Sequence, residues 1–243
     1  MKKRILITGG SRGIGFCIAK KLCEAGHDVV IAGKNLEKLI ESSEIIKPTG
    51  FIAVDMLERD SGKKIYESAV DFIGTVDVLI NNAGLYHWSG IEKTLPADIE
   101  KILKVNLQVP IELCGFVVSE MKKQKWGRII NIGSISGAVG EANASLYSAS
   151  KAGLIGLTKS LALELAEYGI TVNVINPGWV KTELSQNVFD EGVLNEEEQL
   201  EMVPQKRWIE PNEIAELVKY LISDSACGIT GQSLNLCCGL SLG

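Results

Sequence analysis

Short apolar segments alternate along the chain with longer segments in which apolar residues recur every three or four positions. The short segments are almost continuously apolar, which is typical of parallel strands buried on both faces. The longer segments have the period of amphipathic helices. The pattern predicts strands at residues 4–8, 28–32, 51–54, 76–80, 128–132, 171–175 and 233–236.

Helices are predicted between these strands, so the chain consists of repeated βαβ units. Such units build a doubly wound parallel sheet, and we predict a seven-stranded Rossmann fold of the α/β class with helices on both faces. Ligands of these sheets bind at the carboxyl ends of the strands. The predicted helices span residues 14–25, 36–46, 61–73, 97–123 with a break near Asn106, 146–168 and 212–223.

The composition narrows the class of protein. No linker or low-complexity tract divides the 243 residues, so we expect a single domain over 1–243. A formal net charge of −5 argues against a nucleic-acid-binding protein, which usually carries a basic stripe. Nothing resembles a membrane span or a cleaved signal, and the six cysteines show no metal-ligand spacing. We therefore expect a cytoplasmic protein with free thiols, no metal site and no membrane partner.

The first predicted strand is followed by a glycine-rich turn, T-G-G-S-R-G-I-G, which opens the first predicted helix. Glycines at this place let backbone amides approach a pyrophosphate at the helix N-terminus. The alternative is a tight strand–helix connection without a ligand. We predict a dinucleotide site that includes Gly9, Ser11, Arg12, Gly13, Ile14 and Gly15.

The end of the second predicted strand bears on the choice of dinucleotide. An acidic residue would be expected there if the ribose hydroxyls of NAD were bound, but the chain has Lys34 instead. Arg12 adds a second cation. Two cations without a carboxylate favour a 2′-phosphate, so we predict NADP(H), with NAD(H) as the alternative if both cations are ordinary solvated charges.

Polar residues follow the third and fourth predicted strands. Asp55 could accept a hydrogen bond from the adenine amino group, and Met56 lies beside it. The N-N-A-G segment places Asn82, Ala83 and Gly84 where they could line the cofactor, although a plain Asx turn explains the same residues. We include these five residues in the predicted cofactor site.

Tyr147 and Lys151 are four residues apart in a predicted helix, which puts both side chains on one face. A phenol has a pKa near 10, and a neighbouring cation lowers it. We therefore expect acid–base chemistry beside the bound dinucleotide. Taken singly, the tyrosine could be a packing residue, Ser134 a turn serine and Asn106 a residue at a helix break.

Several motifs occur together and in order: T-G-G-S-R-G-I-G, N-N-A-G, K-V-N-L, I-G-S-I-S-G, Y-S-A-S-K and N-P-G-W-V-K-T. On these motifs the whole chain resembles the short-chain dehydrogenase/reductase family. The resemblance implies that Ser134 binds the substrate carbonyl, Tyr147 donates the proton, Lys151 binds the nicotinamide ribose and Asn106 holds a water in a proton path. It also implies nicotinamide contacts from Pro177, Gly178, Val180 and Thr182, and a substrate lid over residues 183–206.

The motifs are most similar to the 3-oxoacyl-[acyl-carrier-protein] reductase branch, which implies a 3-oxoacyl thioester substrate and homodimers or homotetramers. Lys122, Lys123, Lys125 and Arg128 offer a basic patch for an acidic carrier protein. Two alternatives remain: a reductase of a cyclic, steroidal or other bulky ketone, and a dinucleotide-sensing protein without activity. The predicted substrate pocket contains Ser136, Trp179, Tyr86 and His87.

Overall fold

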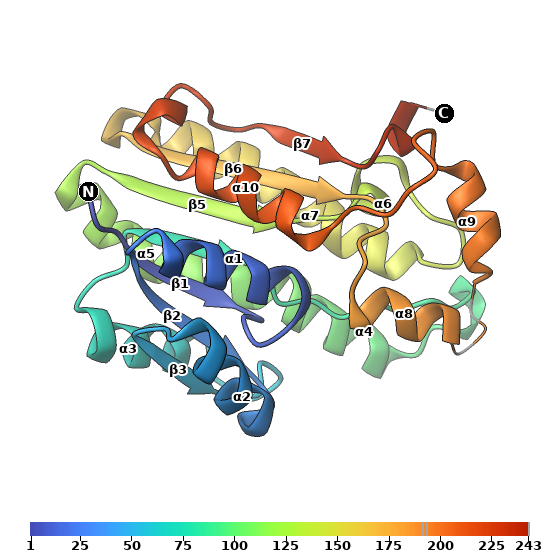
Figure 1. The fold of residues 1–243 in the computed structure, drawn as a ribbon, viewed down its shortest axis with the longest axis horizontal. Coiled ribbons are helices and arrows are strands. Elements are labelled where there is room, and N and C mark those ends of the chain that lie inside the picture. Colours follow the sequence, from blue (N-terminus) through green and yellow to red (C-terminus); the bar gives the residue numbers. More distant parts are fainter. Residues whose placement is uncertain (191, 193, 243) are drawn as a thin grey trace.

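Seven parallel strands form one twisted sheet in the order β3-β2-β1-β4-β5-β6-β7. The structure in Figure 1 is a computed structural model that describes residues 1–190, 192 and 194–242. The strand order reverses between β1 and β4, which is where doubly wound sheets bind dinucleotides. The strands are β1 Arg4–Thr8, β2 Asp28–Gly33, β3 Gly50–Ala53, β4 Val78–Asn81, β5 Gly127–Ile132, β6 Ile170–Pro177 and β7 Ser233–Leu236.

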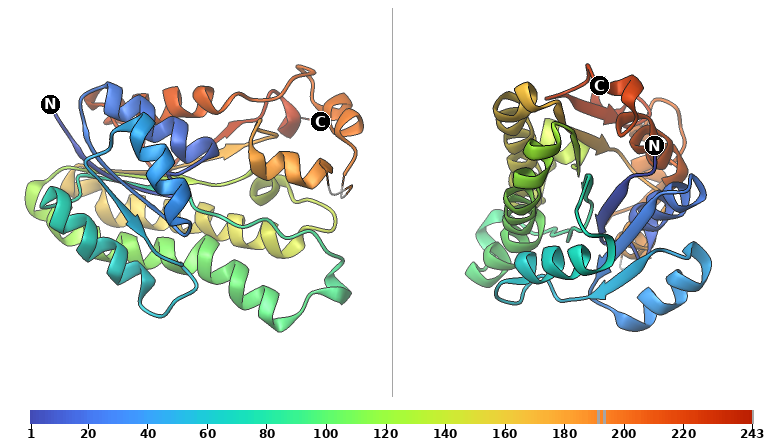
Figure 2. Two further views of the ribbon diagram at one scale, coloured as in Figure 1. Left: turned by 60° about the horizontal axis from the view of Figure 1, so that its bottom comes forward. Right: turned by 90° about the vertical axis from the view of Figure 1, so that its left-hand side faces the viewer.

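Helices cover both faces of the sheet, as the end-on view in Figure 2 shows. The alternation of side chains in β1 illustrates how the two cores form. Ile5 and Ile7 point into the core under α1, α2 and α10, whereas Leu6 points into the core under α3, α5 and α7. These helices are α1 Gly13–Glu24, α2 Leu36–Ile46, α3 Ser61–Ile73, α5 Val109–Gln124, α7 Ser145–Leu165 and α10 Pro211–Leu221.

The predicted class, the seven strands and their parallel order are confirmed. The helix expected at 97–123 is divided into α4 Pro96–Leu103, a π-helical turn Lys104–Gln108 and α5, with Asn106 inside the turn. Three helices were not predicted because they are short or carry few apolar residues. They are α6 Ile135–Val139, α8 Glu183–Asp190 and α9 Glu196–Met202.

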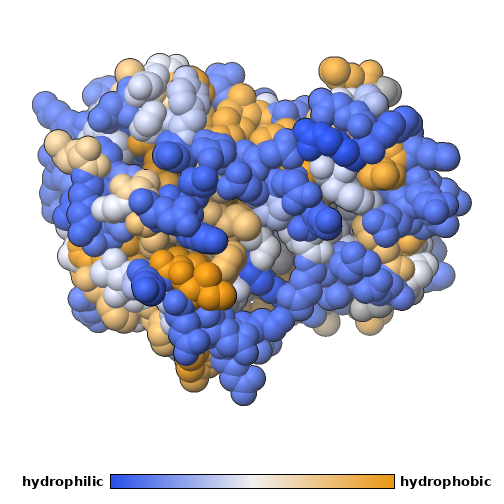
Figure 3. Space-filling model, viewed as in Figure 1, coloured by the Kyte–Doolittle hydropathy of each residue, from blue (hydrophilic) through white to orange (hydrophobic). Residues whose placement is uncertain are grey.

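By length and composition alone, the segment Pro96–Gln124 could cross a membrane. The prediction that nothing in the chain resembles a membrane span is corrected accordingly. Its apolar residues are used inside the molecule instead. Val109, Leu113 and Val117 are buried against the sheet in the core beneath α3, α5 and α7. The face of the molecule in Figure 3 is mostly hydrophilic, with apolar residues in small separate patches.

The carboxyl ends of the strands lie at one edge of the sheet, beside α8 and α9 in Figure 1. Residues 191 and 193, inside the predicted lid, and residue 243 lie outside the described residues. Helices α8 and α9 occupy most of the predicted lid segment. The single domain over 1–243 and the lid over 183–206 remain predictions.

Candidate active site

The glycine-rich turn passes from β1 to α1 through conformations that favour glycine. Gly9 and Gly13 have positive φ angles of 68° and 55°. Gly15 is restricted by space, because a Cβ atom there would collide with the carbonyl oxygen of Gly9 and the side-chain amide of Asn82. The turn therefore keeps backbone amides at the N-terminus of α1 free of side-chain bulk, which suits an anionic pyrophosphate.

Thr8 and Asn82 join the ends of β1 and β4 beneath this turn. The hydroxyl oxygen of Thr8 accepts hydrogen bonds from the backbone amides of Asn82 at 3.0 Å and Ala83 at 3.1 Å. The side-chain amide of Asn82 donates to the carbonyl oxygens of Thr8 at 2.9 Å and Gly9 at 3.1 Å. Thr8 was absent from the predicted site, although its position at the end of β1 was a usable signal.

A cleft of about 910 Å³ runs along this edge of the sheet and gathers the predicted dinucleotide site. Its size and its glycine-lined floor fit an extended dinucleotide. Gly15 is not one of the lining residues. The predicted residues that line the cleft are Gly9, Ser11, Arg12, Gly13, Ile14, Lys34, Asp55, Met56, Asn82, Ala83, Gly84 and Thr182.

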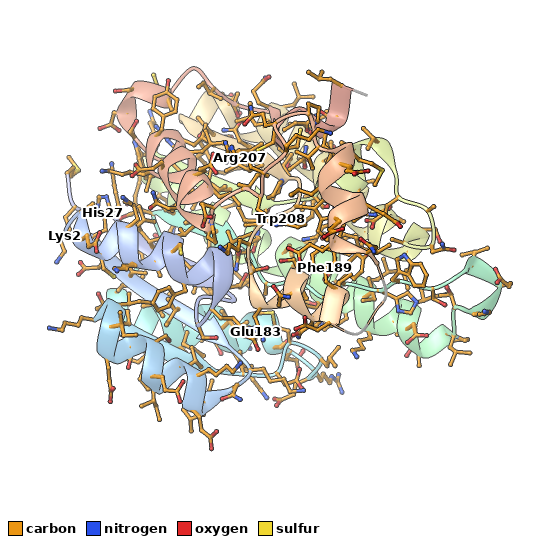
Figure 4. The ribbon with its side chains drawn as sticks, turned by 45° about the vertical axis from the view of Figure 1, so that its right-hand side comes forward. Lys2, His27, Glu183, Phe189, Arg207 and Trp208 are labelled. Carbon is orange, nitrogen blue, oxygen red and sulfur yellow. The ribbon has the colours of Figure 1, made fainter. Side chains whose placement is uncertain are left out.

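Three cations of the cleft, Arg12, Lys34 and Lys38, are paired with carboxylates. The Lys34 ammonium lies 2.8 Å from the Asp55 carboxylate, and this contact holds the pKa of Asp55 below its usual value. Glu183, at the start of α8, lies 2.9 Å from both Arg12 and Lys38 and thereby links the lid segment to the cofactor cleft (Figure 4). Lys38 and Glu183 were absent from the predicted site, because no local motif relates residues 145 positions apart.

Ser134, Tyr147 and Lys151 line a second cavity, of about 320 Å³, which adjoins the first at Ile14, Asn82 and Gly84. Ser134 follows β5 and caps α6, where its hydroxyl oxygen accepts a hydrogen bond from the backbone amide of Ser136 at 3.2 Å. Tyr147 and Lys151 come from the first two turns of α7. The tertiary fold thus brings three of the four predicted catalytic residues to one cavity.

Burial dominates the titration of this group. It raises the pKa of Tyr147 to about 12, although a hydrogen bond with Ser134 opposes the shift. Burial also lowers the pKa of Lys151 to about 8, since its side chain is only 4% exposed. The Lys151 ammonium donates to the carbonyl oxygen of Ile132 at 2.9 Å and lies 5.8 Å from the centre of the Tyr147 ring. The prediction that the pKa of Tyr147 is lowered is therefore wrong, because burial raises it.

Asn106 is fully buried in the π-helical turn and pairs with the backbone of Leu85. Its side-chain oxygen accepts from the Leu85 amide at 2.8 Å, and its side-chain nitrogen donates to the Leu85 carbonyl at 2.9 Å. The same nitrogen donates to the Ser150 hydroxyl at 3.0 Å, and Ser150 donates to the Tyr147 carbonyl at 2.7 Å. Asn106 therefore ties the N-N-A-G loop to the helix that carries Tyr147.

The second cavity is lined by most of the predicted substrate and nicotinamide residues, namely Ser136, Tyr86, Trp179, Pro177, Gly178, Val180 and Thr182. His87 does not line it, and its buried Nε2 atom has no hydrogen-bond partner among the described residues. Helices α8 and α9 contribute Val188 and Met202 to the walls. Glu141 also lines the cavity and was absent from the predicted site.

Aromatic side chains join α8 and α9 to the body of the protein. The ring of Phe189 on α8 lies 5.2 Å from that of Trp179 and 5.3 Å from that of Trp208 (Figure 4). The indole nitrogen of Trp208 donates to the Glu196 carboxylate on α9 at 3.1 Å. Trp179 therefore belongs both to the cavity wall and to the aromatic contact that positions α8.

The predicted basic patch is not continuous. Arg128 is only 2% exposed and donates to the carbonyl oxygens of Gly127 and Gly169, so it cannot contribute to a surface. It lies near the start of β5, whereas Ser134 follows the end of that strand. The remaining lysines, Lys122, Lys123 and Lys125, lie near the same amino end of β5, opposite the cavity. The patch as predicted is therefore wrong.

Comparisons with known proteins agree with this geometry. The sequence model of the short chain dehydrogenase family matches residues 3–192. The chain is 38% identical to the uncharacterized oxidoreductase YxjF of Bacillus subtilis, with 97% of each chain covered. It is 36% identical to the 3-oxoacyl-[acyl-carrier-protein] reductase FabG of Aquifex aeolicus, with 95% of this chain and 94% of the relative covered.

Two solved structures have the same fold. An actinorhodin polyketide ketoreductase variant with NADPH superimposes with a TM-score of 0.94 at 32% identity, covering 99% of this chain and 97% of the other. A 3-ketoacyl-(acyl-carrier-protein) reductase from Brucella melitensis, complexed with NADH, gives a TM-score of 0.91 at 27% identity and covers 98% of both chains. The predicted resemblance is confirmed, and the chain belongs to the short-chain dehydrogenase/reductase family of oxidoreductases.

Proposed function

We propose that this protein reduces a ketone to a secondary alcohol, or catalyses the reverse reaction, with NADP(H) as the coenzyme. The observation that supports the proposal best is the convergence of Ser134, Tyr147 and Lys151 on a cavity that adjoins the dinucleotide cleft. When bound, the nicotinamide supplies or accepts the hydride. The protein residues have to bind the carbonyl, provide the proton and exclude water.

Ser134 and Tyr147 are proposed to act directly on the substrate carbonyl. The serine hydroxyl donates a hydrogen bond to the carbonyl oxygen, and the tyrosine hydroxyl transfers its proton to that oxygen as negative charge develops there. A tyrosine with a pKa raised to about 12 is protonated at neutral pH, which suits the role of an acid in the direction of reduction.

Lys151 and Asn106 are proposed to support the tyrosine. Lys151 binds the nicotinamide ribose and stabilises the phenolate that remains after proton transfer. Its ammonium and the Asn106 side-chain oxygen both face Gly84, where a Cβ atom would lie 3.2 Å and 3.6 Å from them. This arrangement supports the prediction that Asn106 holds a water beside Lys151 and so supplies a proton path to solvent.

The preference for NADP(H) rests on three cations, Arg12, Lys34 and Lys38, at the end of the cleft that follows β2. A 2′-phosphate forms strong charge-assisted hydrogen bonds with such groups. The carboxylates that pair with them, Asp55 and Glu183, are exposed enough to be screened by water, so a phosphate could displace them. NAD(H) is the alternative coenzyme.

Two classes of substrate are supported by different observations. Relatives named 3-oxoacyl-[acyl-carrier-protein] reductases favour a 3-oxoacyl thioester, with an acyl carrier protein as the partner that presents it. The aromatic walls formed by Tyr86 and Trp179, and the structural relative named a polyketide ketoreductase, favour a cyclic or bulky ketone. We propose the thioester as the first candidate and the bulky ketone as the second.

We also propose a cytoplasmic homodimer or homotetramer that pairs α5 and α7 between subunits. Much of the apolar surface of these helices is used in the core, where Leu113 and Leu154 are buried. Ile111 on α5 and Leu163 on α7 instead point outward, 46% and 85% exposed, and would be covered by a partner helix.

The experiment that tests the function measures NADPH oxidation with acetoacetyl thioesters, cyclic ketones and steroids. The wild type should consume NADPH with at least one class, and the class separates the two candidates. The variant Tyr147→Phe should abolish turnover and leave NADPH binding nearly intact. A Tyr147→Phe variant that turns over normally would contradict the mechanism.

A further inference from the structure

One carboxylate, that of Glu141, lines the cavity that holds Tyr147. Among the described residues of the lining, the only other charged side chain is Lys151. Glu141 follows Gly140, which has a φ of 85° and ends α6. The proposed reaction gives this carboxylate no role.

Glu141 is bound by two hydroxyl groups. Its Oε1 atom accepts a hydrogen bond from the Tyr86 hydroxyl at 2.7 Å, and its Oε2 atom accepts one from the Ser136 hydroxyl at 2.6 Å. Both distances are typical of hydrogen bonds to an ionised carboxylate. A carboxylate has about four acceptor sites, so about half remain available to another donor.

Both partners of Glu141 contact the proposed catalytic residues. The Ser136 hydroxyl accepts a hydrogen bond from the Ser134 hydroxyl at 3.1 Å. The ring of Tyr86 packs edge-on against that of Tyr147, with 4.9 Å between the ring centres. The negative charge of Glu141 also contributes to raising the pKa of Tyr147. The carboxylate is therefore one side chain away from the atoms that would bind the substrate carbonyl.

The charges in the cavity discriminate between kinds of substrate. A substrate carboxylate near Glu141 would be repelled, and the Lys151 ammonium that could offset it is buried and donates to the Ile132 carbonyl. A substrate ammonium would be attracted by Glu141 and repelled by Lys151, so the two charges oppose each other. A neutral hydroxyl is repelled by neither charge. Glu141 already accepts hydrogen bonds from the hydroxyl groups of Tyr86 and Ser136.

We propose that Glu141 selects neutral ketones that carry a hydroxyl group close to the carbonyl, by accepting a hydrogen bond from that hydroxyl, and disfavours ketones that carry a carboxylate. The inference rests on the proposed ketone reduction and, within it, favours the second substrate candidate, because a 3-oxoacyl thioester carries no hydroxyl group beside its ketone. Glu141 is thus a specificity-determining residue and takes no part in proton or hydride transfer.

The test compares kcat/KM for two pairs of ketones in the presence of NADPH. The pair 2-hydroxycyclohexanone and cyclohexanone reports the hydroxyl preference, and the pair acetoacetate and ethyl acetoacetate reports the exclusion of an anion. In Glu141→Leu the preference for the hydroxyketone should fall by about tenfold, because a partly buried acceptor is lost. In Glu141→Gln acetoacetate should gain about tenfold relative to its ester, because the charge is removed while the shape is kept.

Two controls keep the outcomes separate. Glu92→Gln changes an exposed carboxylate outside the cavity and should change neither ratio. NADPH binding, followed by fluorescence, reports that each variant is folded. Unchanged ratios in the active Glu141 variants would overturn the inference alone. A wild type that reduces none of the four ketones or the thioesters would contradict the proposed function.

Discussion

The Lys34 ammonium and the Asp55 carboxylate lie 2.8 Å apart across the ends of β2 and β3. The cation expected to bind the 2′-phosphate of NADP(H) is therefore already paired, by the residue expected to bind the adenine. Lys34 is 73% exposed at its side chain, so the pair is well hydrated and weak. A phosphate can replace Asp55 at little cost, whereas an uncharged ribose hydroxyl forms a weaker hydrogen bond with the Lys34 ammonium.

This relationship predicts the effect of Lys34→Asp on coenzyme choice. The variant should lower kcat/KM for NADPH by about ten- to hundredfold, because it replaces an attractive charge by a repulsive one at the 2′-phosphate. The value for NADH should change much less. Steady-state kinetics with both coenzymes measures the ratio, and Lys20→Asp, an exposed change of the same charge on α1, is the control. A wild type with a lower KM for NADH than for NADPH would refute the assignment.

Glu183 predicts a second effect on coenzyme binding. It holds Arg12 and Lys38 together, and these contacts lower its own pKa. In Glu183→Gln both cations become available, so the Kd for NADPH should fall by about two- to fivefold at low salt. The gain should shrink near about 0.5 M salt, where exposed charges are screened. Titration of NADPH fluorescence measures both values.

The matched control for Glu183 is Glu197→Gln, which removes a carboxylate from α9, outside the cofactor cleft. It should leave the Kd for NADPH unchanged at both salt concentrations. An unchanged Kd in Glu183→Gln would show that its ion pairs do not compete with the coenzyme.

The burial of Lys151 predicts that this residue lowers the stability of the folded protein although it supports activity. Its pKa falls from 10.5 to about 8 on folding, so the unfolded chain binds more protons between these values. The free energy of unfolding should therefore rise with pH across this window, and the folded state carries a penalty below pH 8. Lys151→Met removes the penalty and should stabilise the protein at pH 7 by roughly 1–3 kcal/mol, allowing for the lost hydrogen bond to Ile132.

Urea denaturation of the wild type and Lys151→Met at pH 7 and at about pH 10 measures this difference. The advantage of the variant should shrink at the higher pH, where the wild-type lysine is neutral in the folded state. The same variant should lose turnover, because the ribose contact and the charge beside Tyr147 are lost. A variant that is less stable than the wild type at pH 7 would contradict the burial argument.

Much of the fold could be predicted because the relevant signals are local. The apolar runs of β1 and β5 and the glycines at Gly9 and Gly13 each specify a strand or a turn within a few residues of themselves. The break at Asn106 could be placed for the same reason, although not its π-helical form. Tyr147 and Lys151 share one helical face by spacing alone.

Other features could not be predicted because they depend on segments that are distant in the chain. Arg128 was predicted to be a surface charge, but its side chain is buried and donates a hydrogen bond to the carbonyl oxygen of Gly169, 41 residues away. The titration of Tyr147 followed burial rather than its helical neighbour, since burial is set by the whole cavity. The position of Glu141 in the cavity could not be predicted either, because its partner Tyr86 is 55 residues away in sequence.

The class of fold, the order of the motifs along the chain and the identity of the groups available for carbonyl chemistry follow from the sequence alone, because backbone periodicity and motif spacing are properties of neighbouring residues. Which charges meet, as in the pairs Lys34–Asp55 and Arg12–Glu183, depends on the tertiary structure, and so does the set of polar groups that line the cavity, among them Glu141. The reason is that electrostatic interaction and burial depend on distance in space, and packing of the two helical layers on the sheet sets those distances.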